Sequence, residues 1–201
     1  MKLYLLFTII LFSALFIGCV NQIENKKIEG FNIPLPENWI DKSQLSIKEN
    51  LSKFDLEESE ISNLLKTHNG SIPIAIYMKH NPSEFSGPIP TIQVNLRPNN
   101  SKNLISFKKV MQKSILQVSD YFSNFTIITP LEEIEIDGIK GIKFVSQFEL
   151  PNKFGDAWTI RSWTYAFPSG KYFYQINFSD SENENSEEVY KKVINQVRFN
   201  K

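Results

Sequence analysis

The spacing of apolar positions changes along this chain, and each change marks a different kind of segment. Residues 3–17 form an apolar run with few polar interruptions, whereas residues 21–29 are polar and have no clear period. From residue 30 onwards, apolar side chains recur at every second position or at every third and fourth position, as in strands and helices. The pattern predicts a targeting segment over residues 1–18, a tether over residues 19–29 and one folded domain over residues 30–201.

Three stretches of the domain have the period of a helix. Residues 104–122 place their apolar side chains at spacings of three and four, and Ser101 is expected to cap this helix. Residues 56–67 predict a shorter helix that follows Asp55. Ser186 is expected to begin a last helix, whose valines share one apolar face.

Strand patterns occupy most of the remaining domain. The clearest is Thr91–Arg97, in which three apolar side chains alternate with polar ones. The other predicted strands are a short one at Phe31–Leu35, then Ile72–Lys79, and a meander of Phe125–Thr129, Ile134–Ile136, Gly141–Leu150, Trp158–Phe167 and Tyr172–Phe178. Several of these strands are apolar on both sides, which requires cover on both faces. The order predicts an α+β fold, with an antiparallel central sheet and helices on both of its faces.

The charge balance narrows the range of partners. The chain has 22 Lys plus Arg and 22 Asp plus Glu, so its formal net charge is zero. Binding to nucleic acid depends on a basic field, and a nucleic-acid partner is therefore not expected.

The single cysteine, Cys19, follows directly after the apolar run. A membrane-spanning helix needs about 20 apolar residues, and this run is shorter. A signal peptide that made no use of Cys19 would leave a lone thiol in an oxidising compartment. Leu15–Cys19 has the sequence LFIGC and resembles the lipobox of bacterial lipoproteins, although Phe16 stands where a branched aliphatic residue is usual.

The lipobox resemblance implies a lipoprotein. The signal would be removed before Cys19 and the thiol would be acylated, with palmitate or a similar chain. The lipid bilayer is then an expected partner, and the domain is held on the extracytoplasmic side of a bacterial cell envelope. Because Val20 rather than Asp follows the cysteine, the resemblance implies the outer membrane if the host is Gram-negative. The alternative is an ordinary signal peptide with an incidental cysteine.

Three segments of the domain resemble the PsbP-like family, which includes bacterial lipoproteins of the DcrB type. They are Gly30–Trp39 (GFNIPLPENW), Ile134–Phe144 (IEIDGIKGIKF) and Glu187–Phe199 (EEVYKKVINQVRF), together with the long helix before the meander. The resemblance implies an α/β/α sandwich with an accessory or binding role. It implies no shared chemistry and no site residues, because its motifs are packing and turn features.

The sequence has no catalytic signature. Neither His68 nor His80 belongs to a metal-ligand pattern, and phosphate-binding glycine motifs and activated-nucleophile motifs are missing. Glu133, Glu135 and Asp137 share the side of a strand opposite two isoleucines, which is typical of a solvated face. The expectation is a protein that is not an enzyme, with no metal and no cofactor.

Aromatic residues gather on the last two strands of the meander. Arg161, Trp163 and Tyr165 share one side of their strand by alternation. They are either a core layer with Arg161 stacked at its edge or a binding patch, because Trp, Tyr and Arg concentrate at binding hot spots. Phe154 lies in a loop that contains Gly155, and it is a further candidate contact residue.

The favoured function is a non-catalytic domain that binds another envelope protein or supports an assembly. One alternative is a carrier of a small ligand, bound in an aromatic-lined cleft near the loop at Asn81–Pro90. An enzyme of unrecognised type is the third hypothesis.

Overall fold

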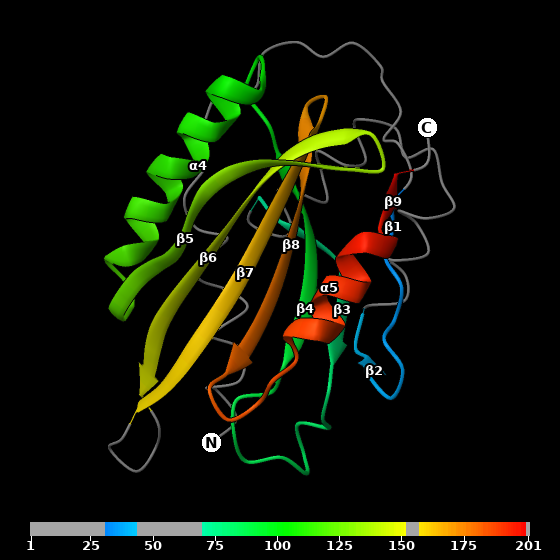
Figure 1. The fold of residues 1–201 in the computed structure, drawn as a ribbon, viewed down its shortest axis with the longest axis vertical. Coiled ribbons are helices and arrows are strands. Elements are labelled where there is room, and N and C mark those ends of the chain that lie inside the picture. Colours follow the sequence, from blue (N-terminus) through cyan, green and yellow to red (C-terminus); the bar gives the residue numbers. More distant parts are fainter. Residues whose placement is uncertain (1–30, 44–69, 152–156, 200–201) are drawn as a thin grey trace.

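A seven-stranded antiparallel sheet forms the centre of the molecule (Figure 1). The computed structural model describes residues 31–43, 70–151 and 157–199. Cys19, Phe154 and the helix expected over residues 56–67 lie outside the described residues. The strand order is β2 (Ile40–Asp41), β3 (Ile72–Met78), β4 (Thr91–Pro98), β8 (Tyr172–Ser181), β7 (Ala157–Ser169), β6 (Ile139–Pro151), β5 (Ser123–Ile136).

Two helices cover opposite faces of this sheet. Helix α4 (Leu104–Ser119) packs its buried side chains on β6, β7 and β8, whereas helix α5 (Glu187–Gln196) packs on the other face (Figure 1). The predicted α+β fold with helices on both faces is therefore confirmed. Within the described ranges, no helix is long and apolar enough to cross a membrane.

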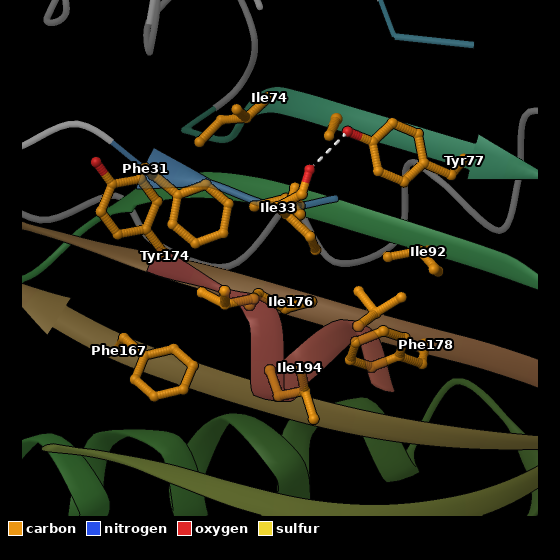
Figure 2. Packing of buried hydrophobic residues seen from close by; sticks show 14 of the residues in the cluster. Phe31, Ile33, Ile74, Tyr77, Ile92, Phe167, Tyr174, Ile176, Phe178 and Ile194 are labelled. Carbon is orange, nitrogen blue, oxygen red and sulfur yellow. Dashed lines mark hydrogen bonds between the residues drawn. The ribbon is translucent and has the colours of Figure 1, made fainter. Parts of the chain in front are cut away.

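The larger part of the core lies on the α5 face. A two-stranded ribbon of β1 (Phe31–Asn32) and β9 (Arg198–Phe199) closes one end of it. The Phe31 ring stacks on Tyr174 with centroids 4.6 Å apart, and the Tyr77 hydroxyl donates to the Ile33 carbonyl at 3.1 Å (Figure 2). The beginning and the end of the domain are thus joined through one aromatic cluster.

The edge strand β5 corrects one prediction. Phe125–Thr129 and Ile134–Ile136 were predicted as separate strands, but β5 is a single strand of 14 residues. Its pairing with β6 shifts register three times, and Pro130 lies within it. An edge strand tolerates proline and bulges because one side of its backbone needs no ladder partner.

Two local predictions were wrong. Asn103, and not Ser101, caps α4, since its side chain accepts a hydrogen bond from the Ser106 N–H at 2.9 Å within a capping box. In β3, the alternation of Ile72, Ile74, Ile76 and Met78 predicts one buried side, but the pairing shifts between Pro73 and Ala75, so the buried side changes after the bulge. Tyr77 is consequently buried, while the neighbouring isoleucine at position 76 is only half-buried.

Candidate functional site

A cleft of about 410 Å³ opens on the α5 face, beside the loop that joins β8 to α5. The β7 strand contributes two of the residues in its wall, and β8, the loop and the start of α5 contribute the rest. The described residues that line it are Arg161, Trp163, Asp180, Ser181, Glu182, Glu184, Asn185 and Glu187. Four carboxylates and one guanidinium make this lining acidic.

The wall on β7 contains two of the predicted binding residues. The Arg161 guanidinium carbon lies 5.7 Å from the Trp163 ring centroid, within the range of a cation–π contact. Trp163 packs edge-on against Tyr190 of α5, with centroids 5.3 Å apart. The buried Arg161 Nε has no hydrogen-bond partner within the described part of the chain. The structure therefore places a stacked Arg–Trp pair in the cleft wall.

Tyr165 is not among the lining residues of the cleft. Its ring packs edge-to-face on Phe178, with centroids 5.6 Å apart, and burial raises the pKa of its hydroxyl. Phe167 and Tyr174, from the same aromatic group, are buried in the core. The aromatic residues of β7 and β8 therefore divide between the two interpretations: some belong to the core, and Trp163 borders the cleft.

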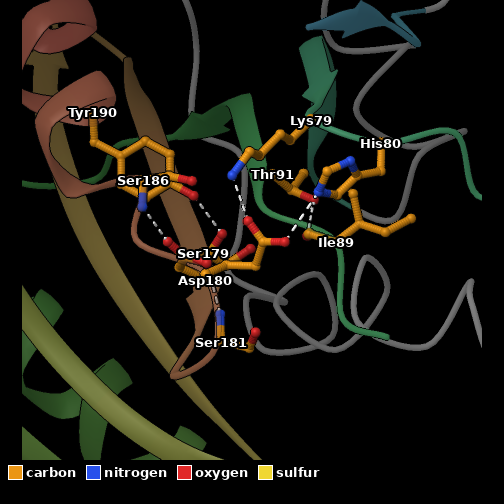
Figure 3. Close-up of polar contacts among 10 residues, drawn as sticks. Lys79, His80, Ile89, Thr91, Ser179, Asp180, Ser181, Ser186 and Tyr190 are labelled. Atoms are coloured by element: carbon orange, nitrogen blue, oxygen red, sulfur yellow. Dashed lines mark hydrogen bonds and ion pairs between the residues drawn. The ribbon is translucent and has the colours of Figure 1, made fainter. Parts of the chain in front are cut away.

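Asp180 shapes the floor of the cleft. This buried carboxylate accepts the Ser181 N–H at 2.9 Å and the Ser186 N–H at 2.7 Å (Figure 3). Burial raises the pKa of Asp180, and the two backbone hydrogen bonds oppose that shift. Because Ser186 begins α5 without a capping bond from its own side chain, Asp180 supplies an acceptor at the helix start.

Glu184 joins the cleft to the loop between β3 and β4. Its carboxylate forms an ion pair with Lys79 and lies 3.1 Å from His80 Nε2 (Figure 3). The His80 ring stacks on Phe85, with centroids 4.2 Å apart. The hydrogen bond from Lys79, and to a smaller extent that from His80, lowers the pKa of Glu184. The predicted loop region therefore meets the cleft through Glu184.

The ion pair at Glu184 predicts a specific pH dependence. A carboxyl whose pKa is lower in the folded state stabilises the fold above its ordinary value of 4.5, and this contribution is lost as the pH falls through the folded pKa. We expect Glu184→Gln to lower the melting temperature at neutral pH and to flatten its fall below pH 4.5. Thermal melts between pH 3 and pH 7 measure this, and the exposed Glu182→Gln is the control. Equal acid profiles for both variants would contradict the assignment.

The acidic lining was missed in the sequence. Within residues 180–188 (DSENENSEE), the sequence interpretation covers only the helix start at Ser186–Glu188, although the carboxylates of this segment are dense enough to indicate an acidic loop. The pairing of β7 with β8 sets Arg161 opposite Asp180, and this pairing brings the acidic segment beside Arg161. That register is a tertiary feature with no signal in either segment alone.

The carboxylates near the β5–β6 turn lie where the sequence predicts. Glu133, Glu135 and Asp137 are exposed, so the solvated face is confirmed. Asp137 also accepts the Phe199 N–H at 2.8 Å and so holds β9 to this turn. Within the described ranges, no group of three or more His, Cys, Asp or Glu side chains is arranged to hold a metal ion.

A second polar cluster lies on the α4 face. Arg97 is 4% exposed, its Nη1 donates to Gln175 Oε1 at 3.1 Å, and burial lowers its pKa to about 10. Asn177 accepts from Gln175 and from Thr164, which continues the network across three strands. The alternation of Gln93, Asn95 and Arg97 was the sequence signal for this polar layer. A buried hydrogen-bonded network that links three strands favours one strand register.

Comparison with known proteins shows a shared fold. No protein-family model matches the chain, and no curated protein is similar to it in sequence. LpqN of Mycobacterium tuberculosis, described as involved in cell envelope biogenesis, superposes with a TM-score of 0.51 at 14% identity, over 90% of this chain and 93% of LpqN. Cyanobacterial PsbP from Synechocystis sp. PCC 6803 gives 0.49 at 10% identity, over 91% and 96%. The sheet, its two helix layers and the near-complete overlap with LpqN confirm the expected α+β fold, an antiparallel sheet with helices on both faces.

Proposed function

We propose that this chain is a lipid-anchored protein of the bacterial cell envelope, whose PsbP-like domain binds an envelope protein and carries out no reaction. The cleft lined by Arg161 and Trp163 is the observation that carries the binding role. The lipobox-like segment ending at Cys19 supports the anchor. The shared fold with LpqN, a protein involved in cell envelope biogenesis, is in keeping with the location.

The composition of the cleft favours a partner with cationic side chains. Glu182 belongs to its lining and is exposed, whereas Glu187, also in the lining, forms an ion pair with Lys191 of its own helix at 3.1 Å. Trp163 offers an aromatic edge beside them, and aromatic residues within a charged rim are typical of binding hot spots. A segment of an envelope protein that presents Lys or Arg would satisfy the carboxylates and pack on the ring.

Two carboxylates of the cleft, those of Asp180 and Glu184, are held by hydrogen bonds and ion pairs, which supports binding rather than catalysis. Asp180 is engaged by two backbone N–H groups, and Glu184 is engaged by Lys79 and His80. A general acid or base needs a proton-transfer position that faces a substrate. Carboxylates held in structural hydrogen bonds are poorly placed for that task.

The volume of the cleft favours one other candidate. About 410 Å³ lies within the range of sites for small molecules. A small organic cation would use the same carboxylates and the same indole ring as a protein segment. Native mass spectrometry of protein purified from its host distinguishes the two, because a carried ligand would add a defined mass to the chain.

The anchor is tested at Cys19. We expect Cys19→Ala to abolish acylation and to leave the signal uncleaved before this position, since the thiol is the only acceptor in the chain. Intact mass spectrometry and metabolic labelling with palmitate measure both effects. An unchanged N-terminal mass, or label that persists in the variant, would contradict the lipoprotein assignment.

The binding site is tested by crosslinking in intact cells. We expect Trp163→Ala to reduce capture of the partner about tenfold or more, because truncating a hot-spot aromatic costs more than about 1.4 kcal/mol. Trp158→Ala is the matched control, since Trp158 lies on the same strand but on its other side. A partner captured equally by both variants would place binding elsewhere on the domain.

A further inference from the structure

The outer surface of α4 combines aliphatic and basic side chains. Residues three or four apart lie along one side of a helix, and this chain has an exposed strip with that spacing. The strip consists of Ile105, Lys109, Gln112, Leu116 and the neighbouring Lys113. Ile105 is 68% exposed and Leu116 is 70% exposed, so the aliphatic groups at both ends of the strip face solvent.

All the charged side chains of α4 are positive. The segment Leu104–Ser119 contains three lysines and no acidic residue. Lys108 lies 3.7 Å from Glu133 of β5, whereas Lys109 and Lys113 are exposed and have no ion-pair partner among the described residues. Since the whole chain has a formal net charge of zero, this positive charge is a local property of α4.

Further exposed apolar side chains lie outside the helix. Tyr121, directly after α4, is 59% exposed, and Ile127 and Ile128, which follow one another in the edge strand β5, are also exposed. Helix α4 and β5 lie side by side along one margin of the sheet (Figure 1). Exposed aliphatic and aromatic groups together with lysines, on one side of a domain, are typical of surfaces that lie on lipid headgroups.

We infer that the outer strip of α4, with the start of β5, rests on a lipid bilayer that carries anionic headgroups. The lysines pair with headgroup phosphates, while Ile105 and Leu116 enter the boundary of the acyl chains. This contact does not depend on acylation of Cys19. If Cys19 is acylated, residues 20–30 can extend over at most about 40 Å, which keeps the domain within reach of the membrane.

The contact would orient the cleft. Arg161 and Trp163 lie on the α5 side of the sheet, and α4 lies on the opposite side. With α4 on the bilayer, the cleft opens away from the membrane. A partner could then reach the acidic loop without competing with lipid for the same face.

The contact is tested with the full chain carrying Cys19→Ala, so that an introduced cysteine is the only thiol. An environment-sensitive fluorophore is attached at Leu116→Cys in one sample and at Lys192→Cys, on α5, in the control. With phosphatidylglycerol-containing vesicles, we expect the label at position 116 to shift to the blue and to become protected from an aqueous quencher. The label at position 192 should not change. The apolar N-terminal run is identical in both samples.

Charge reversal provides the second measurement. A double variant of the Cys19→Ala chain carries Lys109→Glu and Lys113→Glu. We expect its partition coefficient between water and phosphatidylglycerol-containing vesicles to be lower by about tenfold or more. Lys140→Glu with Lys192→Glu changes the net charge equally and should have little effect. Both lysine pairs are exposed, and circular dichroism checks that each variant is folded.

Two outcomes would overturn the inference. One is a label at position 116 that stays as accessible to the quencher as the label at position 192, which would leave this face to a protein partner. The other is an equal response to vesicles of phosphatidylcholine alone, which would show that the lysines do not recognise headgroup charge. Neither outcome bears on the cleft or on acylation of Cys19, which have their own tests.

Discussion

Phe178→Ala is expected to lower the free energy of unfolding by about 3–5 kcal/mol. Phe178 is fully buried on β8 (Figure 2). Its ring centroid lies 4.9 Å from that of Tyr190 and 5.6 Å from that of Tyr165. Truncation removes the buried ring and leaves a cavity between the sheet and α5, which the strands cannot close because their ladders hold them apart. Urea denaturation followed by circular dichroism measures the loss.

The control for this prediction is Phe85→Ala. Phe85 is half-buried and stacks on His80 in a loop, so the same chemical change should cost about 1 kcal/mol or less. Phe178→Ala should also weaken partner capture in the crosslinking experiment, because Tyr190 supports Trp163 from the same side. A loss below about 1.5 kcal/mol at Phe178 would mean that α5 repacks freely on the sheet, contrary to the packing described.

Gly141→Ala is the second change with a large expected effect. A Cβ at this position of β6 would lie 2.5 Å from Phe167 Cδ1 and 2.6 Å from the Ala166 carbonyl oxygen. The carbonyl belongs to the neighbouring strand and cannot rotate away, so the strands must separate locally. We expect a loss of about 1–3 kcal/mol, the usual range for overpacking a core.

Lys140→Ala is the matched control for Gly141→Ala. Lys140 is the adjacent residue on β6 and is exposed, so its truncation should change stability by no more than about 0.5 kcal/mol. Thermal and urea denaturation of the two variants give the comparison. A Gly141→Ala protein as stable as the Lys140→Ala protein would show that β6 and β7 can separate at no cost.

The meander and the two described helices could be predicted because their signals are local. The Asp137-Gly138 dipeptide between β5 and β6 adopts positive φ at both residues, as a two-residue hairpin turn requires. Ser186 begins α5, as predicted. Predictions failed where the pairing with a neighbouring strand overrides the local period, as at the β3 bulge beside Ala75. A bulge changes which side chains are buried without any change in composition.

The candidate site could be predicted only in part. Alternation along β7 correctly puts Arg161 and Trp163 on the same side of the strand, because strand geometry is local. Whether that side is core or surface depends on how far α5 extends over it. Helix α5 begins at Glu187, so it covers Phe178 and leaves Arg161 at the margin, next to the acidic loop.

The sequence by itself determined the α+β class, the antiparallel meander and a shared face for Arg161, Trp163 and Tyr165 of β7. These follow from residue periodicity and turn chemistry, which act over a few residues. Only the tertiary structure decided that Asp180 pairs opposite Arg161, that the Glu184 carboxylate forms an ion pair with Lys79, and that the lysines of α4 face away from the cleft. Such pairings depend on strand register and on which face each helix covers, and both are set by packing between segments far apart in the chain.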